Sequence, residues 1–302
     1  GLGVSTGGRK PIYLEINPEV GYMISVEISR TAFNYAVFDF CENIVIHKKQ
    51  LIRSDNLIEE LTSIINNCIM TFNHEYSENL CGIAIGVRGF LDNESGTIIY
   101  SGVLGLTNVP LKKIIEEQFN VPVFIDSHTR FEAIGEWTDS YNCEIDNFMY
   151  LSVSWGMSMS GFLNRALIRG KGNAGEIGLN HLIPGDKDKL LQKFCAGSFI
   201  VEEILKDWES PDNTYLKNLY LENRNELLLG DIVKAIYAGD CFSLRHVSAA
   251  AVNLGIVVSN VILIFDPEEV VIGGELSRFG DYLLNPLKES VREILTGIRL
   301  EI

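Results

Sequence analysis

Residues 22–51, YMISVEISRTAFNYAVFDFCENIVIHKKQL, decide the fold of this 302-residue chain. They contain three apolar or alternating runs separated by turn residues, at Tyr22–Ile28, Ala32–Phe38 and Ile44–Leu51. Short runs of this kind predict an antiparallel meander of three strands. A helical stripe of apolar residues follows over Leu57–Phe72. A meander followed by a helix is typical of the start of an α/β domain.

The rest of the chain continues this order and then repeats it. A buried strand is expected at Cys81–Val87, then a loop over residues 89–96, a helix from Pro110 to Phe119 and a strand at Val121–Asp126. The second half is predicted to contain strands at Phe148–Val153, Met157–Leu163, Ala166–Arg169 and Val270–Ile272, and helices at Ser198–Trp208, Leu228–Tyr237, Phe242–Phe265 and Tyr282–Leu295. The repeated order predicts two related α/β domains that face a central cleft.

The composition excludes several classes of function. The hydrophobic content of 46% can fill a sizeable core, and the formal charge of −15 opposes contact with phosphate backbones or anionic lipid. The six cysteines form no CxxC pair, which is typical of a reducing cytoplasm. The longest apolar stretch, residues 249–265, is interrupted by polar residues and glycine. We therefore expect a cytoplasmic protein that binds neither DNA nor membrane through these residues.

Several motifs, taken together, resemble the ROK family (repressors, open reading frames and kinases). They are a linker-like Ser5–Pro11, the loop Gly86–Gly89 with Gly96–Ile98, the signature core Gly175–Gly178, and the strand and turn Asp266–Gly274. The resemblance covers nearly the whole chain. It implies the actin-like ATPase (ribonuclease H-like) fold, with duplicated α/β domains around a central cleft.

The resemblance also implies domain boundaries. Residues 1–11 are expected to be the linker from a missing DNA-binding domain, as in the xylose-repressor and N-acetylglucosamine-repressor class. The first subdomain is expected to comprise residues 12–127 with 288–302, and the second residues 128–287.

The positions that transfer phosphate in ROK kinases differ here. The resemblance aligns the first phosphate loop with Glu27–Thr31, which has no glycine, and the catalytic aspartate with His128. The glycines that remain of the nucleotide site are Gly156, Gly161, Gly273 and Gly274. Phosphoryl transfer needs a carboxylate beside the attacking hydroxyl and glycine backbones around the phosphates. We therefore expect no catalytic residue, no ATP binding and no kinase activity.

The zinc site that the resemblance implies is eroded as well. Family members hold zinc through the histidine that ends their Gly-Glu-Ile-Gly-His motif and three cysteines in the next loop, a Cys3His set. Here Leu179 stands at the histidine position, residues 180–190 contain no cysteine, and Cys195 aligns beyond the last zinc cysteine. His181 lies nearby without partners, so we expect no metal.

Five residues remain as candidates for binding a ligand. The resemblance places Glu176 at the family's sugar-binding glutamate, Ser127 and His128 at the pair that bonds sugar hydroxyls, and Gln192 at a second glutamate. Arg88 adds a cation suited to an anionic or carboxylated ligand. Structural roles remain open alternatives: a solvated loop charge for Arg88, a cap or ion-pair partner for Glu176 and a satisfied buried side chain for His128.

Three functions are compatible with these patterns. The first is the effector-binding domain of a transcriptional regulator of carbohydrate metabolism, in which a sugar or sugar derivative changes how a homodimer, or a dimer of dimers, presents an N-terminal helix-turn-helix absent from these residues. The second is an active ROK kinase that phosphorylates a hexose with ATP, which an ADP-release assay would detect. The third is an inactive relative that acts through protein contacts alone, for which no sugar would shift the melting temperature.

Overall fold

The protein is described by a computed structural model over residues 16–54, 56–73, 79–140, 143–180, 189–212, 215–222 and 226–296. The chain forms two compact units, residues 1–131 and residues 132–302. The boundary lies within helix α3 (His128–Asp139). Each unit contains its own sheet and its own hydrophobic core.

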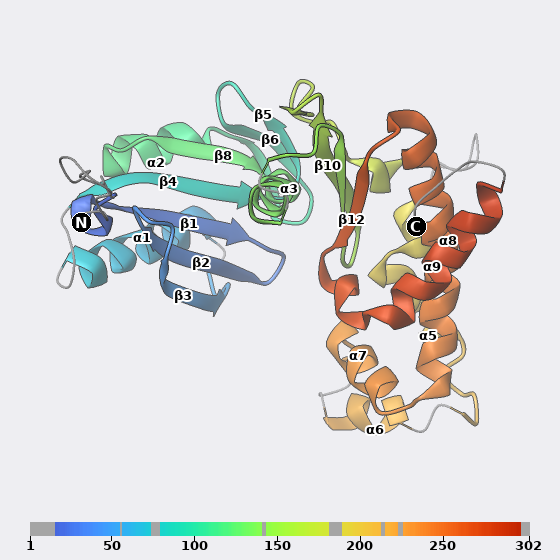
Figure 1. Ribbon diagram of the computed structural model, residues 1–302. Helices are drawn as coiled ribbons and strands as arrows, with labels where there is room; N and C mark the ends of the chain where they lie inside the picture. Colours follow the sequence, from blue (N-terminus) through green and yellow to red (C-terminus); the bar gives the residue numbers. More distant parts are fainter. Residues whose placement is uncertain are drawn as a thin grey trace, which may run out of the picture. The chain divides into compact units, whose positions relative to one another are not determined.

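The first unit is built on a five-stranded sheet in the order β3-β2-β1-β4-β8 (Figure 1). Its strands are β1 (Tyr22–Ile28), β2 (Ala32–Asp39), β3 (Ile44–Leu51), β4 (Leu80–Val87) and β8 (Val123–Ser127). Strands β1, β2 and β3 pair antiparallel, whereas β1, β4 and β8 run parallel. The predicted meander is confirmed, and the three parallel strands end at a common edge.

Helices α1 (Leu57–Asn73) and α2 (Leu111–Phe119) complete the core of the first unit. Every second residue of β1, from Tyr22 to Ile28, is buried against them. Each fully buried leucine or isoleucine of this core contributes about 1.5–3 kcal/mol of burial free energy. The buried residues of β1, which recur every second position, therefore pack in one apolar layer with those of α1, which recur about every 3.6 positions.

Within the segment expected to be a loop, residues 89–96, Phe90–Asp92 forms a strand of a small antiparallel sheet, while residues 93–96 form a turn. The strands of this sheet are β5 (Phe90–Asp92), β6 (Thr97–Ser101) and β7 (Leu106–Val109), in the order β5-β6-β7. Gly89 and Gly96 have positive φ angles of 133° and 63°, which glycine adopts readily. The strands are three to five residues long, too short to give a clear alternating pattern.

The second unit contains a four-stranded sheet in the order β11-β10-β9-β12. Its strands are β9 (Phe148–Val153), β10 (Met157–Leu163), β11 (Ala166–Leu167) and β12 (Glu269–Gly273). Its helices are α3, α4 (Gln192–Cys195), α5 (Gly197–Lys206), α6 (Tyr215–Glu222), α7 (Leu229–Tyr237), α8 (Cys241–Phe265) and α9 (Asp281–Ile294). Strands β9, β10 and β11 form the predicted second meander, and β12 pairs parallel with β9.

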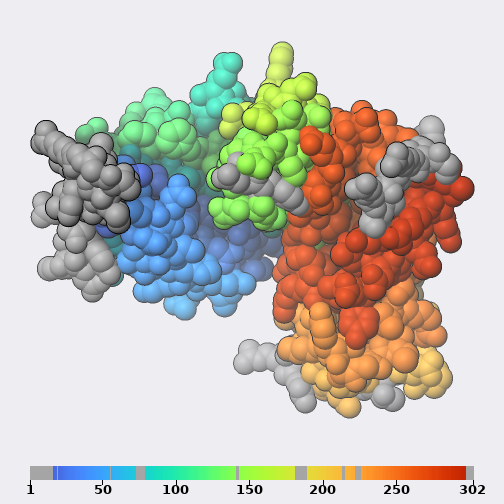
Figure 2. Space-filling model, viewed as in Figure 1, coloured from blue at the N-terminus to red at the C-terminus, as the bar shows by residue number. Residues whose placement is uncertain are grey.

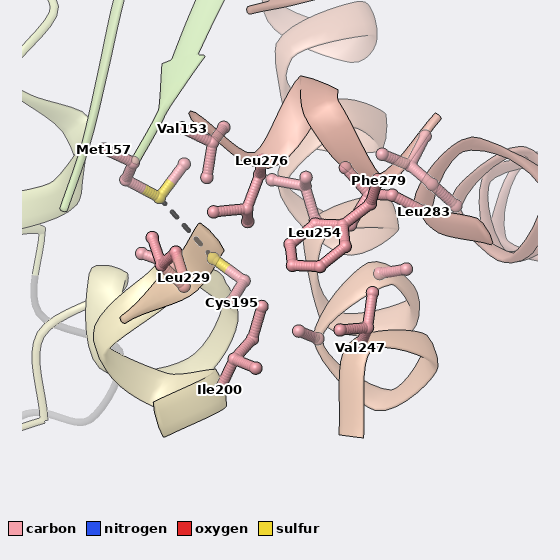
Figure 3. Close-up of a cluster of buried hydrophobic side chains, with 14 of the residues drawn as sticks. Val153, Met157, Cys195, Ile200, Leu229, Val247, Leu254, Leu276, Phe279 and Leu283 are labelled. Carbon is pink, nitrogen blue, oxygen red and sulfur yellow. Dashed lines mark hydrogen bonds between the residues drawn. The ribbon is translucent and has the colours of Figure 1, made fainter. Parts of the chain in front are cut away.

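The two faces of this sheet bury different side chains. Val153 and Met157 lie on one face, in the same cluster as Leu254 of α8 and Phe279 (Figure 3). Phe162 lies on the other face, where its ring stacks on Trp137 of α3 with centroids 4.1 Å apart. The strands therefore have helices packed on both faces.

Helix α8 is the core helix of the second unit. Among the described residues it is the one helix long and apolar enough to cross a membrane, yet half of its most apolar window is buried within the protein. Leu254 and Val258 pack in the unit's main cluster. Helices α8 and α9 lie in the orange and red part of the surface in Figure 2. The hydropathy of α8 is accounted for by this packing.

The boundaries of the units differ from those expected. Leu287, Val291 and Leu295 pack in the cluster that contains α8, and Ser290 Oγ donates to the Val252 carbonyl at 2.9 Å. Residues 288–296 therefore belong to the second unit, because the apolar face of α9 is matched by α8. The first boundary falls after Phe131 rather than after residue 127. The expected linker, residues 1–11, and residues 297–302 lie outside the described part of the chain.

Candidate functional site

Polar residues gather at the carboxyl edge of the first unit's parallel strands. Glu27 pairs with Gly86, and Gly86 pairs with Asp126, so β1, β4 and β8 reach this edge in a common row. Arg88 directly follows β4, while Ser127 and His128 lie where β8 passes into α3. We call Glu27, Arg88, Ser127 and His128 the carboxyl-edge group. Ligands of open α/β sheets bind beyond the carboxyl ends of the strands.

A buried ion pair fixes the backbone that carries this group. The Arg130 guanidinium donates to the Asp126 carboxylate, and both side chains are almost fully buried. The same carboxylate oxygen accepts the Ser127 N–H at 2.8 Å. The pair therefore fixes the turn from β8 into α3, where His128 begins the helix. Sequence reasoning assigned no role to Arg130, because Asp126 lies in β8 and Arg130 in α3, so their spacing of four residues is not a pair on one helix.

His128 is buried and uncharged. Burial, and then the positive charge of Arg88, lower the pKa of His128 to about 3 against a smaller opposing effect of the Val87 carbonyl. Nε2 lies 3.3 Å from Thr129 Oγ1, and the effect of Val87 on the pKa comes from a hydrogen bond to its backbone. A neutral imidazole carries one donor and one acceptor, which suits a hydroxyl group better than an anion.

Arg88 and Glu27, 61 residues apart in sequence, form a long ion pair. Arg88 Nη2 lies 3.5 Å from Glu27 Oε1, and Glu27 Oε2 accepts a hydrogen bond from Asn34 Nδ2 at 2.9 Å. Arg88 Nε is buried and has no hydrogen-bond partner among the described residues. The predicted site residue Arg88 therefore lies beside the predicted site residue His128 and an acidic partner that the sequence did not reveal.

The segment aligned with the first phosphate loop is held by hydrogen bonds between Ser29 and Ala32. Ser29 Oγ donates to the Ala32 carbonyl at 2.7 Å and accepts the Ala32 N–H at 3.1 Å. The serine side chain therefore fills the turn between β1 and β2, where a glycine loop would leave backbone N–H groups open for a phosphate.

The other two candidates, Glu176 and Gln192, lie in the second unit. Glu176 follows Gly175, whose carbonyl accepts the Met159 N–H at 2.7 Å, so this segment lies along β10. Gln192 begins α4, and a Cβ placed on Gly156 would lie 2.8 Å from Gln192 Oε1. Both side chains are half-buried. Gly156 thus leaves room for the Gln192 amide beside the turn between β9 and β10.

The glycines aligned with the nucleotide site allow close packing within the second unit. We call Gly156, Gly161, Gly273 and Gly274 the packing glycines. A side chain on Gly273 would collide with the Tyr150 hydroxyl, and one on Gly161 would collide with the Phe148 carbonyl. Close packing alone therefore accounts for glycine at both positions.

Gly274 has a second constraint. Its φ angle is 80°, and a Cβ there would lie 2.6 Å from the Val153 carbonyl and 2.8 Å from Ser154 Oγ. Ser154 Oγ in turn accepts the Glu275 N–H at 3.0 Å. The serine thus occupies the space between β9 and the turn after β12.

Cys195, which aligns beyond the family's zinc cysteines, lies among apolar neighbours. Burial raises the pKa of the Cys195 thiol to about 12, and its Sγ lies 3.5 Å from both Met157 Sδ and the Leu191 carbonyl. Burial therefore favours the protonated form of this thiol. Leu179 stands at the histidine position, and the described residues hold no cluster of three His, Cys, Asp or Glu side chains. His181 lies outside the described residues.

Two α/β units, each with a meander followed by parallel strands, define the actin-like ATPase fold. The chain belongs to the ROK family, whose family model matches residues 23–299. It is 28% identical over 308 residues to the xylose repressor of Caldicellulosiruptor bescii, covering 97% of this chain and 75% of that protein.

Solved structures share the fold. One is a ROK family transcriptional regulator described as a homologue of the E. coli MLC protein, with a TM-score of 0.79 and 22% identity over 90% of this chain and 70% of that chain. Another is a ROK family glucokinase from Streptomyces griseus in complex with glucose and AMPPNP, with a TM-score of 0.79 and 20% identity over 93% and 92% of the two chains. The fold and the family expected from the sequence are confirmed, while the ligand-binding role of the five candidate residues stays a prediction.

Proposed function

We propose that this chain is the effector-binding domain of a ROK transcriptional regulator of carbohydrate metabolism and that it does not phosphorylate its ligand. The resemblance to a xylose repressor over nearly the whole chain supports the regulatory role. The ligand is a sugar or a sugar derivative, contacted by Arg88, Ser127, His128, Glu176 and Gln192.

The main support for the proposed lack of kinase activity is that the carboxyl edge offers no available carboxylate at the base position. A kinase base needs an available carboxylate near the attacking hydroxyl. Asp126, the nearest carboxylate in sequence to the base position, is buried against Arg130, and the base position itself holds the neutral His128. The serine-closed β1–β2 turn and the close packing around the packing glycines argue in the same direction, against ATP binding.

Regulation requires that the effector bind two conformations of the protein with different affinities. We assign DNA contact to a helix-turn-helix outside these residues, since a net charge of −15 opposes phosphate backbones. The regulator is proposed to be cytoplasmic, to bind no zinc, and to act as a homodimer or a dimer of dimers.

Two assays on the same preparation test the proposal. A thermal-shift screen over pentoses, hexoses and their derivatives should show an increase in melting temperature with at least one sugar. An ADP-release assay with ATP, magnesium and that sugar should show no turnover above background. Robust turnover would establish the alternative, an active sugar kinase, and a screen without any shift would reject the effector role.

His128→Asp provides a sharper version of the kinase test. Restoring the carboxylate at the base position should not restore turnover, because the serine-closed turn and the packing glycines still fail to form a phosphate site. Turnover in this variant alone would show that ATP binds and that only the base had been lost.

A further inference from the structure

Arg88 and Arg130, two cations at the carboxyl edge of the first unit, have different surroundings. Arg130 is buried in close contact with the Asp126 carboxylate. Arg88 is partly exposed, with 27% of its side-chain surface accessible, and its described acidic partner is Glu27 at 3.5 Å. Well-formed hydrogen bonds between a guanidinium and a carboxylate are shorter, at about 2.7–2.9 Å.

Other contacts explain why Glu27 satisfies Arg88 only in part. The second carboxylate oxygen of Glu27 is bound to Asn34 Nδ2 at 2.9 Å, which limits how far the carboxylate can turn toward Arg88. Arg88 Nε stays buried without a hydrogen bond to any described residue. Leaving a buried charged donor unbonded costs free energy. Such an arrangement is expected where a ligand, rather than the protein, supplies the missing acceptor.

The neighbouring groups at this edge favour an anionic acceptor. His128 is neutral, so it does not provide a competing positive charge. The charge of Arg130 is offset by Asp126. Of Arg88 and Arg130, Arg88 therefore has the longer counterion contact, and a guanidinium matches the paired oxygens of a carboxylate or a phosphate.

We propose that the effector carries a carboxylate or a phosphate group that binds Arg88 through Nε and Nη2 and displaces the Glu27 contact, with an adjacent hydroxyl bound to His128. This inference rests on the proposed effector role and narrows the ligand to sugar acids, such as uronates and aldonates, and sugar phosphates.

Calorimetric titration of the whole chain at low ionic strength tests the proposal. The ligands are D-xylose and D-glucose as neutral sugars, D-glucuronate and D-gluconate as sugar acids, and D-glucose 6-phosphate as a sugar phosphate. At least one charged ligand should bind ten times more tightly than either neutral sugar. The carboxylate and phosphate ligands separate the two sources of anionic charge.

Three variants assign any preference to Arg88. Arg88→Gln should reduce affinity for the charged ligand roughly ten- to hundredfold, the value of a charge-assisted hydrogen bond, and should reduce affinity for a neutral sugar less. Glu27→Gln should strengthen binding of the charged ligand several-fold, because the competing carboxylate is gone. Arg245→Gln, which removes the same charge from an exposed site in the second unit, should change neither affinity.

The outcomes separate this inference from the function on which it rests. Binding of a neutral sugar without any preference for a charged one overturns the inference and leaves the effector role intact. A preference that survives in Arg88→Gln, with circular dichroism confirming the fold, also overturns it. If no sugar of either kind binds, the effector role itself fails.

Discussion

The carboxyl-edge group of the first unit and the packing glycines of the second unit both align with ligand-binding parts of ROK kinases, yet they differ in chemistry. The carboxyl-edge group consists of charged or polar side chains, among them Arg88 with an unbonded buried Nε. The packing glycines are enclosed by neighbours of the same unit, including the Tyr150 hydroxyl and the Val153 carbonyl. The carboxyl-edge group contains a hydrogen-bond donor without an acceptor among the described residues, whereas the space beside the packing glycines is occupied by other atoms of the protein.

This difference shows that a family motif can persist for unrelated physical reasons. A glycine remains wherever a second atom lies too close for a Cβ, whether that atom belongs to a nucleotide or to the protein itself. A buried donor without a partner has no comparable structural benefit, because it destabilises the fold. Unbonded polar groups are therefore better indicators of a ligand site in this protein than its glycines.

The largest expected effect is the loss of the ion pair beneath the carboxyl-edge group. Arg130→Met should lower the free energy of unfolding by about 3–5 kcal/mol, because it removes the buried countercharge of Asp126. Urea denaturation followed by circular dichroism measures the loss. The double variant Asp126→Asn with Arg130→Met removes both charges and should recover part of it; a double variant as unstable as the single one would contradict the assigned pairing.

A comparable test on the second unit uses Gly175. Gly175→Ala should lower the free energy of unfolding by about 3 kcal/mol, because its φ of 94° is strained for alanine and the new Cβ would overlap the Met159 carbonyl. Gly105→Ala is the matched control, since Gly105 has a φ of 66° with no atom within 4 Å of the new Cβ. The Gly105→Ala substitution should lower the free energy of unfolding by about 1 kcal/mol. Equal losses in the two variants would rule out the steric contribution at Gly175.

The pH dependence of stability isolates His128. Its pKa is about 3 when folded and near 6.5 in an unfolded chain, so the unfolded state binds more protons below pH 6.5 and stability falls as the pH falls. Between pH 7 and pH 5 this residue alone should remove about 2 kcal/mol. His128→Gln should flatten the profile over that range, while His47→Gln, on the exposed side of β3, should leave it steep. An unchanged profile in His128→Gln would mean that His128 is not held neutral.

The smallest expected effect is at Gly156. Gly156→Ala should lower the free energy of unfolding by less than about 1 kcal/mol, because the new Cβ meets only the flexible end of Gln192. The displaced amide should nevertheless weaken binding of the effector, measured by calorimetry. If Gln192→Ala binds the effector as tightly as the unaltered chain, the proposed ligand role of Gln192 is wrong.

The sequence predicted some features of the fold and site better than others for physical reasons. Long strands and helices, such as Tyr22–Ile28 and the helix that became α8, have a clear hydrophobic period and were placed to within one or two residues. The short strands β5–β7 were missed because three to five residues carry little periodic signal. Family resemblance predicted that residues 288–302 belong to the first unit. The packing of α9 on α8 shows that residues 288–296 belong to the second unit.

The sequence by itself determined the order of the two meanders and of most of the long helices, the family, and which motif positions depart from a kinase. Those features depend on residue type and local spacing, which a sequence records directly. Only the tertiary structure decided that Arg88 meets Glu27, that Arg130 is held by Asp126, and that His128 is neutral. Partners distant in sequence meet only when strands pair, and a pKa depends on how much water surrounding side chains exclude, so neither can be read from a linear pattern.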